Sequence, residues 1–170
     1  MVQQALYMQY YEVYLLFGSN LGERAANIAN AVTLLEGSDI RVIKLSSLYE
    51  TEPWGNKDQP KYINQAGKFN TTLPADQLLK TILETEQKMG RKRTEKWEPR
   101  IIDIDILFFD NQVIDEKDLK VPHPEIENRR FALIPLLEIA PGFEHPVLKK
   151  NVKELLDKCT DAMVVELFRH

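Results

Sequence analysis

Runs of apolar residues, continuous or alternating with polar ones, predict the strands of this chain. The first run covers residues 12–17 and ends at a turn-forming Gly-Ser-Asn sequence, which is typical of a short buried strand. Looser alternation over 40–51 and clearer alternation over 62–72 predict two more strands. Residues 101–109 form a strongly apolar run that predicts another strand, and a last strand is expected over 163–168.

Helical periodicity occupies the segments between these runs. Residues 24–36 carry apolar side chains at helical spacing, and Pro74 fits the first turn of a helix that ends at Gly90. Residues 124–139 are helical in pattern although a proline interrupts them, and Asn151 is placed to cap a short final helix.

The connections complete the expected fold. The segment 52–61, with two prolines and a glycine, predicts a loop. Asp110 and Asn111 favour a hairpin turn from the strand over 101–109 into a strand at 113–114. Because strands and helices are mixed rather than strictly alternating, the pattern favours an α+β domain over a doubly wound parallel sheet.

Composition bounds the class of protein. A chain of 170 residues, 44% of them hydrophobic, is long enough for one domain with its own core. The single cysteine, Cys159, excludes an intrachain disulfide and a multi-cysteine zinc site. The longest apolar stretch, 131–137, is far shorter than a membrane span, and the first residues do not resemble a secretory signal. We therefore expect a cytoplasmic protein.

Charge is concentrated in one segment. Residues 91–100, RKRTEKWEPR, carry five basic and two acidic side chains, a net charge of +3, so the other 160 residues carry −7 of the total of −4. General nucleic-acid binding depends on a broad positive surface, which such a chain lacks. One basic segment on an acidic protein favours a small polyanion as ligand.

The pair Asp103 and Asp105 is the sharpest chemical feature. Residues two apart on a strand point to the same face, with about 6.5–7 Å between their Cα atoms. Two carboxylates so placed can bind a hard divalent cation such as Mg²⁺, although they can also simply face water on a half-exposed strand. With Leu107 and Phe109 expected on the same apolar face, the two charges need a compensating partner.

The basic segment leads directly into this strand. Arginine side chains match phosphate oxygens bidentately, and Trp97 lies among them, although a charge run is often only a solvated loop. Cations from the loop and metals on the strand would surround the same anion, which points to phosphoryl chemistry. Glu86 in the apolar stripe of its helix and His123 between two prolines are smaller clues, each open to a purely structural interpretation.

Motifs of other enzyme classes are missing from the sequence: it has no GxxxxGK[ST], GxGxxG, HExxH or GxSxG. The blocks it does contain, in order, are FGSNLG, SSLYETEPWG, YINQAGKF, GRKRTEKWEPRIIDIDILFF and VPHPEIENRRFALIPLLEIAP. Together they closely resemble the 6-hydroxymethyl-7,8-dihydropterin pyrophosphokinase family of folate biosynthesis over about residues 12–145.

The resemblance implies a fold and a reaction. It implies a ferredoxin-like α+β fold with an antiparallel core sheet, in a single pyrophosphokinase domain over 12–170 after an N-terminal extension of residues 1–11. It implies transfer of pyrophosphate from ATP to the hydroxymethyl group of the pterin, with release of AMP and two Mg²⁺ ions as cofactors. The expected partners are these small molecules, with no nucleic acid and no membrane, and the expected state is a monomer.

Site residues follow from the same resemblance. Asp103 and Asp105 correspond to the metal ligands, and the residues implied in catalysis are these two with Arg91, Arg93 and Arg100. The implied ATP-binding residues are Glu86, Arg93, Trp97, Arg100, His123 and Arg129. The implied pterin-binding residues are Thr51, Pro53, Tyr62, Asn64 and Phe131. The chain departs from the family pattern at Lys96, where several members have arginine, and at Pro124, where some have an aromatic residue.

Two other classes fit parts of the sequence. A ferredoxin-like RNA-binding module would also combine exposed aromatic residues with a basic loop, but the −7 outside that loop and the lack of an aromatic RNA-binding strand count against it. A DxD-type glycosyltransferase would use a similar carboxylate pair, but this chain is short for that class.

Overall fold

The computed structural model describes residues 9–37, 39–53, 59–91 and 99–169. Strand β1 (Tyr11–Ser19) lies in an antiparallel sheet between β4 (Tyr62–Thr71) and β5 (Asp103–Phe109). β1 is apolar on both faces, since Leu15 and Leu16 are both buried on opposite sides. Both faces of the sheet therefore have to be covered. The strand order is β5-β1-β4-β3-β8, in which β3 is Tyr49–Thr51 and β8 is Val165–Leu167, and β2 (Ile40–Leu45) also pairs with β4.

The expected strand over 40–51 is two strands, so that prediction was wrong in its continuity. β2 (Ile40–Leu45) pairs with the second half of β4, and β3 (Tyr49–Thr51) pairs with the first half. Between them Ser46 is buried and binds Ala66 twice, because its N–H donates to the Ala66 carbonyl and its hydroxyl accepts from the Ala66 N–H at 3.0 Å. The Ser46 hydroxyl thus accepts the hydrogen bond that a backbone carbonyl would accept if the strand continued.

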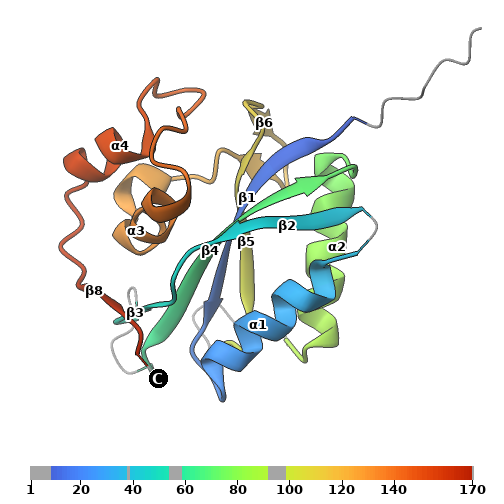
Figure 1. Cartoon of the computed structure of the whole chain (residues 1–170), viewed down its shortest axis with the longest axis vertical. Helices are drawn as coiled ribbons and strands as arrows, with labels where there is room; N and C mark the ends of the chain where they lie inside the picture. Colours follow the sequence, from blue (N-terminus) through green and yellow to red (C-terminus); the bar gives the residue numbers. More distant parts are fainter. Residues whose placement is uncertain (1–8, 38, 54–58, 92–98, 170) are drawn as a thin grey trace, which may run out of the picture.

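Two helices cover one face of the sheet. α1 (Arg24–Leu35) and α2 (Ala75–Lys88) pack their apolar stripes against β1 and its neighbours (Figure 1). The core they enclose includes the buried side chains Val13, Leu15, Phe17, Ile28, Val32, Phe69, Leu78 and Ile82. Both helices begin and end within two residues of the positions that the sequence predicts.

The other face is covered over only part of its length. α3 (Arg130–Ile139) and α4 (Val152–Lys158) pack there on a second core that includes Tyr14, Leu16, Phe108, Leu133 and Leu155. Asn151 caps α4 as predicted, through a reciprocal capping box with Glu154. In Figure 1 these two helices lie at the upper left, away from the lower edge where β1 ends and β4 begins.

Two local predictions fail for backbone reasons. The helix expected over 124–139 begins only at Arg130, because Glu125 has a positive φ of 61° and is followed by the 3₁₀ turn Ile126–Asn128. The expected hairpin does not form either: after the turn at Asp110, β6 (Ile114–Asp115) pairs with β7 (Lys120–Val121) and not with β5.

A bulge in β5 corrects a third expectation. Tyr14 pairs with Phe108 and Leu15 with Ile106, so Leu107 is an extra residue in the ladder. Beyond the bulge the faces exchange, and Phe109 packs in the first core rather than on the face of Asp103 and Asp105. The freed Leu107 carbonyl accepts a hydrogen bond of 2.9 Å from the His123 N–H, which fixes the chain after β7 beside β5. The final strand, β8 (Val165–Leu167), is shorter than expected.

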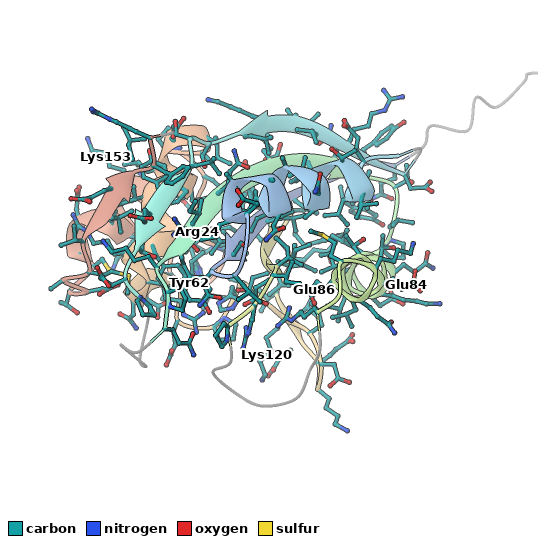
Figure 2. All side chains as sticks on the ribbon, turned by 90° about the horizontal axis from the view of Figure 1, so that it is seen from below. Arg24, Tyr62, Glu84, Glu86, Lys120 and Lys153 are labelled. Atoms are coloured by element: carbon teal, nitrogen blue, oxygen red, sulfur yellow. The ribbon has the colours of Figure 1, made fainter. Side chains whose placement is uncertain are left out.

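The first core predicts a stability difference within α2. Ile82 is fully buried in that core, and Ile82→Ala should lower the free energy of unfolding by about 2–5 kcal/mol through lost burial and a residual cavity. The matched change Glu84→Ala, on the exposed side of the same helix (Figure 2), should alter it by less than about 0.5 kcal/mol. Urea unfolding of both variants measures the difference, and equal effects would contradict this packing.

Candidate active site

A cavity of about 420 Å³ opens on the part of the second sheet face that α3 and α4 leave uncovered. β1 runs antiparallel to β4 and β5, so its carboxyl end meets their amino ends there. Residues from these strands, α2, β3, the start of α3 and the segments that connect these elements line it: Leu16, Gly18, Thr51, Glu52, Gln59, Tyr62, Asn64, Leu79, Leu83, Glu86, Arg91, Arg100, Asp103, Ile104, Asp105, His123, Arg129 and Phe131. Figure 2 labels Tyr62 on β4 and Glu86 on α2.

The floor of the cavity is formed where β1 passes β4. Gly18 pairs with Asn64, and a Cβ at Gly18 would lie 3.3 Å from Asn64 Oδ1 and 3.7 Å from the Tyr62 ring. Asn64 is buried and its amide donates to Thr51 Oγ1 at 3.0 Å, so a strand-edge hydroxyl fixes the orientation of the amide. The absence of a side chain at Gly18 therefore keeps space beside an oriented amide.

One wall of the cavity is a network of charges. Arg91 Nη1 lies 2.6 Å from Asp103 Oδ1, and Arg100 Nη1 lies 2.6 Å from Asp103 Oδ2. Arg91 also pairs with Glu86, whose Oε1 accepts the Ile104 N–H at 2.8 Å. Glu86 thus ties the end of α2 to the start of β5 and to the first residue of the basic segment. Asp103 has an arginine on each of its carboxylate oxygens.

Asp105 has no such partner among the described residues. His123 Nε2 lies 3.9 Å from Asp105 Oδ2, and the charges of Arg129 and Arg91 act on Asp105 from farther away. Burial, followed by the negative charge of Asp103, raises the pKa of Asp105 to about 7. Burial also raises the pKa of Glu86, against the opposing charge of Arg91. Among its described side chains, this wall therefore has three carboxyl groups, of Glu86, Asp103 and Asp105, and two guanidinium groups, of Arg91 and Arg100.

The chain between β7 (Lys120–Val121) and α3 adds His123, Arg129 and Phe131 to the cavity. His123 Nδ1 lies 2.8 Å from the Pro124 carbonyl, and burial together with the charge of Arg129 lowers the pKa of His123. This contact directs Nε2 toward Asp105. The Arg129 guanidinium lies 6.0 Å from the centre of the Phe131 ring, so a cation and an aromatic ring stand together at the start of α3.

Most of the residues singled out in the sequence meet in this cavity. Eleven of them line it, namely Thr51, Tyr62, Asn64, Glu86, Arg91, Arg100, Asp103, Asp105, His123, Arg129 and Phe131. Pro53 is buried next to Glu52, which lines the cavity, but Pro53 itself is not one of the lining residues. Arg93 and Trp97 lie outside the described residues.

Sequence reasoning missed several lining residues. Gly18 was taken only as a turn former, although a glycine at the end of a buried strand was the available signal. Gln59 lines the cavity and its Oε1 accepts from the Asn20 amide at 3.2 Å, a contact across 39 residues that no local pattern indicates. Leu79 and Leu83, in the same apolar stripe of α2 as Glu86, also line the cavity.

Asp103 and Asp105 could hold a divalent cation only together with ligands from outside this pair. No group of three or more His, Cys, Asp or Glu that could hold a metal occurs in the part of the chain that the structure describes. Mg²⁺ is usually held by one or two carboxylates, with substrate phosphates and water completing six oxygen ligands. Asp103 and Asp105 meet that requirement. Burial and the charge of Asp103 raise the pKa of Asp105, and a cation held there would offset both effects by stabilising the carboxylate.

Comparison with known proteins identifies relatives. The model of the 7,8-dihydro-6-hydroxymethylpterin-pyrophosphokinase (HPPK) family matches residues 14–141. The 2-amino-4-hydroxy-6-hydroxymethyldihydropteridine pyrophosphokinase of Aquifex aeolicus is 44% identical over 142 residues, 84% of this chain and 88% of that protein. The Bacillus subtilis protein of the same name is 40% identical, covering 77% of this chain and 79% of its own length.

Longer proteins contain the same unit. The folic acid synthesis protein fol1 of Schizosaccharomyces pombe is 40% identical over 85% of this chain, which spans only 20% of that protein. Among solved structures, wild-type Plasmodium falciparum HPPK-DHPS superimposes with a TM-score of 0.70 at 16% identity, over 88% of this chain and 44% of that one. At that identity the likeness shows the fold, and it confirms the expected ferredoxin-like α+β class.

These matches decide between the classes left open by the sequence, in favour of the pyrophosphokinase over the RNA-binding module and the glycosyltransferase. Within the described residues, no helix is long and apolar enough to cross a membrane.

The raised pKa of Asp105 predicts an inverted pH effect on stability. A free aspartate titrates near pH 3.9, so between about pH 4 and 7 the folded protein holds the Asp105 proton more tightly than the unfolded chain. Ionising Asp105 therefore destabilises the fold as the pH rises through this window. Asp105→Asn removes that charge and should raise the melting temperature, relative to wild type, more at pH 8 than at pH 5.

Thermal unfolding in a metal chelator at both pH values measures this difference. Asp157→Asn, an exposed position on α4, is the matched control and should show no pH-dependent gain. A gain from Asp105→Asn that is the same at both pH values would show that the carboxylate carries no such penalty.

Proposed function

The chain belongs to the 7,8-dihydro-6-hydroxymethylpterin-pyrophosphokinase family, and from this premise we propose how the residues of its cavity carry out the reaction. The enzyme transfers pyrophosphate from ATP to the hydroxymethyl group of 6-hydroxymethyl-7,8-dihydropterin in folate biosynthesis. The transferred group leaves AMP, so the bond that breaks joins the α- and β-phosphates. The single observation that carries the proposal is that arginines and paired carboxylates share one cavity with two aromatic rings.

The charged wall is proposed to bind the phosphates of ATP. Arg91 and Arg100 stand at the two ends of the basic segment. Together with His123 and Arg129 they line the same cavity as Asp103 and Asp105. Guanidinium groups suit this role because they bind phosphate oxygens in pairs. Arg93 and Trp97, which lie outside the described residues, are proposed to contribute from the same segment. Glu86 is proposed to support the nucleotide side by holding Arg91 in place.

Asp103 and Asp105 are proposed to hold two Mg²⁺ ions together with the phosphates. When bound, these ions supply positive charge that neutralises the phosphate oxygens as the group is transferred. Each Asp103 oxygen is paired with an arginine, and Arg91 and Arg100 would leave Asp103 for the phosphates if a metal ion were held there. The released guanidinium groups lie at the same wall and are free to bind the phosphates. The arginines of Asp103 thus hold the carboxylate until metal and nucleotide arrive.

The uncharged half of the cavity is proposed to bind the pterin. Among the described residues, Tyr62 and Phe131 supply the phenyl-type rings that line it, and flat heterocycles are commonly held between such rings. The Asn64 amide, oriented by Thr51, supplies hydrogen bonds to the ring edge, and the backbone near Thr51 and Pro53 borders the same edge. This arrangement directs the hydroxymethyl group toward the charged wall.

Catalysis then consists of positioning and charge neutralisation. The hydroxymethyl oxygen attacks the β-phosphorus, the bond from that phosphorus to the bridging oxygen of the α-phosphate breaks, and the hydroxyl proton is lost. Arg91 and Arg100 stabilise the negative charge on the transferred and leaving groups. Phosphate oxygens beside His123 Nε2 would raise its pKa and favour the imidazolium, which can donate to them.

The remaining expectations join this proposal. A single catalytic domain over residues 12–170 is supported by the sheet that runs from β1 to β8. The acidic charge outside the basic segment supports a protein that binds neither nucleic acid nor membranes, and a cytoplasmic monomer stays our expectation.

The reaction and the metal assignment are tested together. With ATP, Mg²⁺ and 6-hydroxymethyl-7,8-dihydropterin, the wild-type protein should form AMP and not ADP, as separated by ion-exchange chromatography. Asp105→Ala should lower kcat/KM by at least about 10²–10³-fold, since it removes one of two charged ligands, while the circular dichroism spectrum stays unchanged.

Asp115→Ala is the matched control, because Asp115 is an exposed aspartate on β6 that pairs with Lys120 away from the cavity. That variant should keep the wild-type rate. ADP as product would refute the reaction, and near-wild-type turnover by Asp105→Ala would refute the metal assignment.

A further inference from the structure

The C-terminal segment lies beyond the residues that the family model matches, which end at 141. Yet residues 161–168 contact both the start of α3 and strand β3, and each of these carries residues that line the cavity. We infer that this segment is a strap that positions both walls of the pterin half of the site and thereby sets the affinity for the pterin. The inference rests on the pterin-binding role proposed above for Thr51 and Phe131.

One end of the strap is bound to the start of α3. Asp161 Oδ2 accepts the Arg130 N–H at 3.0 Å, and Asp161 Oδ1 accepts the Met163 N–H at 3.0 Å. Arg130 is the first residue of α3, and α3 has no side-chain cap from its own N-cap residue. Asp161 therefore satisfies an amide that α3 leaves open, and it places a carboxylate at the positive end of the helix. The two neighbours of Arg130, Arg129 and Phe131, both line the cavity.

The other end of the strap is bound to β3. β8 pairs antiparallel with β3, so Val165 lies opposite Thr51 and Leu167 opposite Tyr49. The Phe168 N–H then donates to the Leu48 carbonyl at 2.9 Å. β3 is only three residues long and pairs with β4 on its other side, so β8 turns a short edge strand into an internal one. This holds Thr51, which orients Asn64.

A third contact joins the strap to the residues on either side of the segment 52–60. The Arg24 guanidinium lies 5.7 Å from the centre of the Phe168 ring, and its Nη1 lies 2.9 Å from Glu50 Oε1 and donates to the Lys61 carbonyl at 2.9 Å. Glu50 and Lys61 stand just before and just after the segment 52–60. Arg24, labelled in Figure 2, thus ties the end of the strap to both ends of that segment.

Chain length makes the strap a limit on distance. Asp161 and Val165 are four residues apart, and four extended residues span at most about 14 Å. The turn that Asp161 makes with Met163 shortens the span further. The start of α3 and the end of β3 therefore cannot separate without breaking contacts at one end of the strap. Phe131 and Thr51, one from each wall, are kept at a fixed spacing.

The same geometry predicts which substrate is affected. Both parts of the fold held by the strap belong to the pterin half. Most of the proposed ATP contacts instead come from the end of α2, the segment that joins α2 to β5, and His123 after β7, and only Arg129 comes from the start of α3. Loosening the strap should weaken pterin binding more than ATP binding. A residue that merely stabilised the fold would weaken both, or neither.

Two variants of the full-length chain test the strap. Asp161→Ala removes both acceptors, and insertion of two glycines between Met163 and Val164 lengthens the strap while keeping every contacting side chain. Binding of 6-hydroxymethyl-7,8-dihydropterin is measured by calorimetry with Mg²⁺ and an ATP analogue that has a methylene group between its α- and β-phosphates. Each variant should raise the pterin Kd about five- to tenfold, through the lost helix cap in Asp161→Ala and through the slack strap in the insertion variant, and the analogue Kd less than about twofold.

Asp161→Asn keeps one acceptor oxygen and should give an intermediate pterin Kd. Asp157→Ala, an exposed aspartate on α4, is the matched control and should change neither constant. Thermal unfolding checks that each variant is folded. If Asp161→Ala does not fold, the glycine insertion alone tests the strap.

Phe131→Ala separates this inference from the proposal beneath it. If Phe131→Ala weakens pterin binding while folded strap variants leave the pterin Kd unchanged, or weaken both ligands equally, the strap inference is wrong and the proposed site stands. If Phe131→Ala leaves pterin binding intact, the assignment of the pterin half is wrong and the strap inference fails with it.

Discussion

Three carboxylates at one end of the sheet, Glu86, Asp103 and Asp105, repel one another, and the rest of the site depends on how that repulsion is balanced. At short range in a partly buried site, like charges raise the free energy of every ionised form. Two arginines hold Asp103 and one of them also holds Glu86. Asp105 is left with a pKa raised to about 7. A site that keeps excess negative charge in this way favours a ligand that brings cations, and ATP bound with Mg²⁺ is such a ligand.

The fold provides the geometry for this balance. Antiparallel pairing sets the end of β1 against the starts of β4 and β5, and the second pair of helices leaves that corner uncovered. A rigid strand carries the two aspartates, while their cations come from Arg91 and Arg100, at the ends of a segment that joins α2 to β5. The elements that hold the metals are thus fixed by the sheet, and those that bind phosphate are attached at its edge. The residues proposed to bind the pterin come from β3, β4 and the start of α3, and the C-terminal segment links β3 to α3.

Local patterns in the sequence were sufficient for part of this. The spacing of Asp103 and Asp105 placed both on one strand face, and the position of Glu86 in the α2 stripe indicated an inward carboxylate, because period and burial are local properties. The bulge at Leu107, the division of 40–51 at Ser46 and the left-handed Glu125 were not predictable, since each depends on partners distant in the chain. For the same reason neither the arginine pair on Asp103 nor the reach of Asp161 to α3 could be read from spacing. The roles of the site residues came from the family resemblance, and the structure adds that eleven of them share one cavity.

The central claim is that the arginines of Asp103 give way to metal when the nucleotide binds. A crystal structure of the complex with Mg²⁺ and the α,β-methylene analogue of ATP tests it most directly. The account predicts oxygens of Asp103 and Asp105 at about 2.1 Å from Mg²⁺, with Arg91 and Arg100 moved from Asp103 to phosphate oxygens. Nucleotide and metal bound while both arginines remain within hydrogen-bonding distance of Asp103 would contradict it.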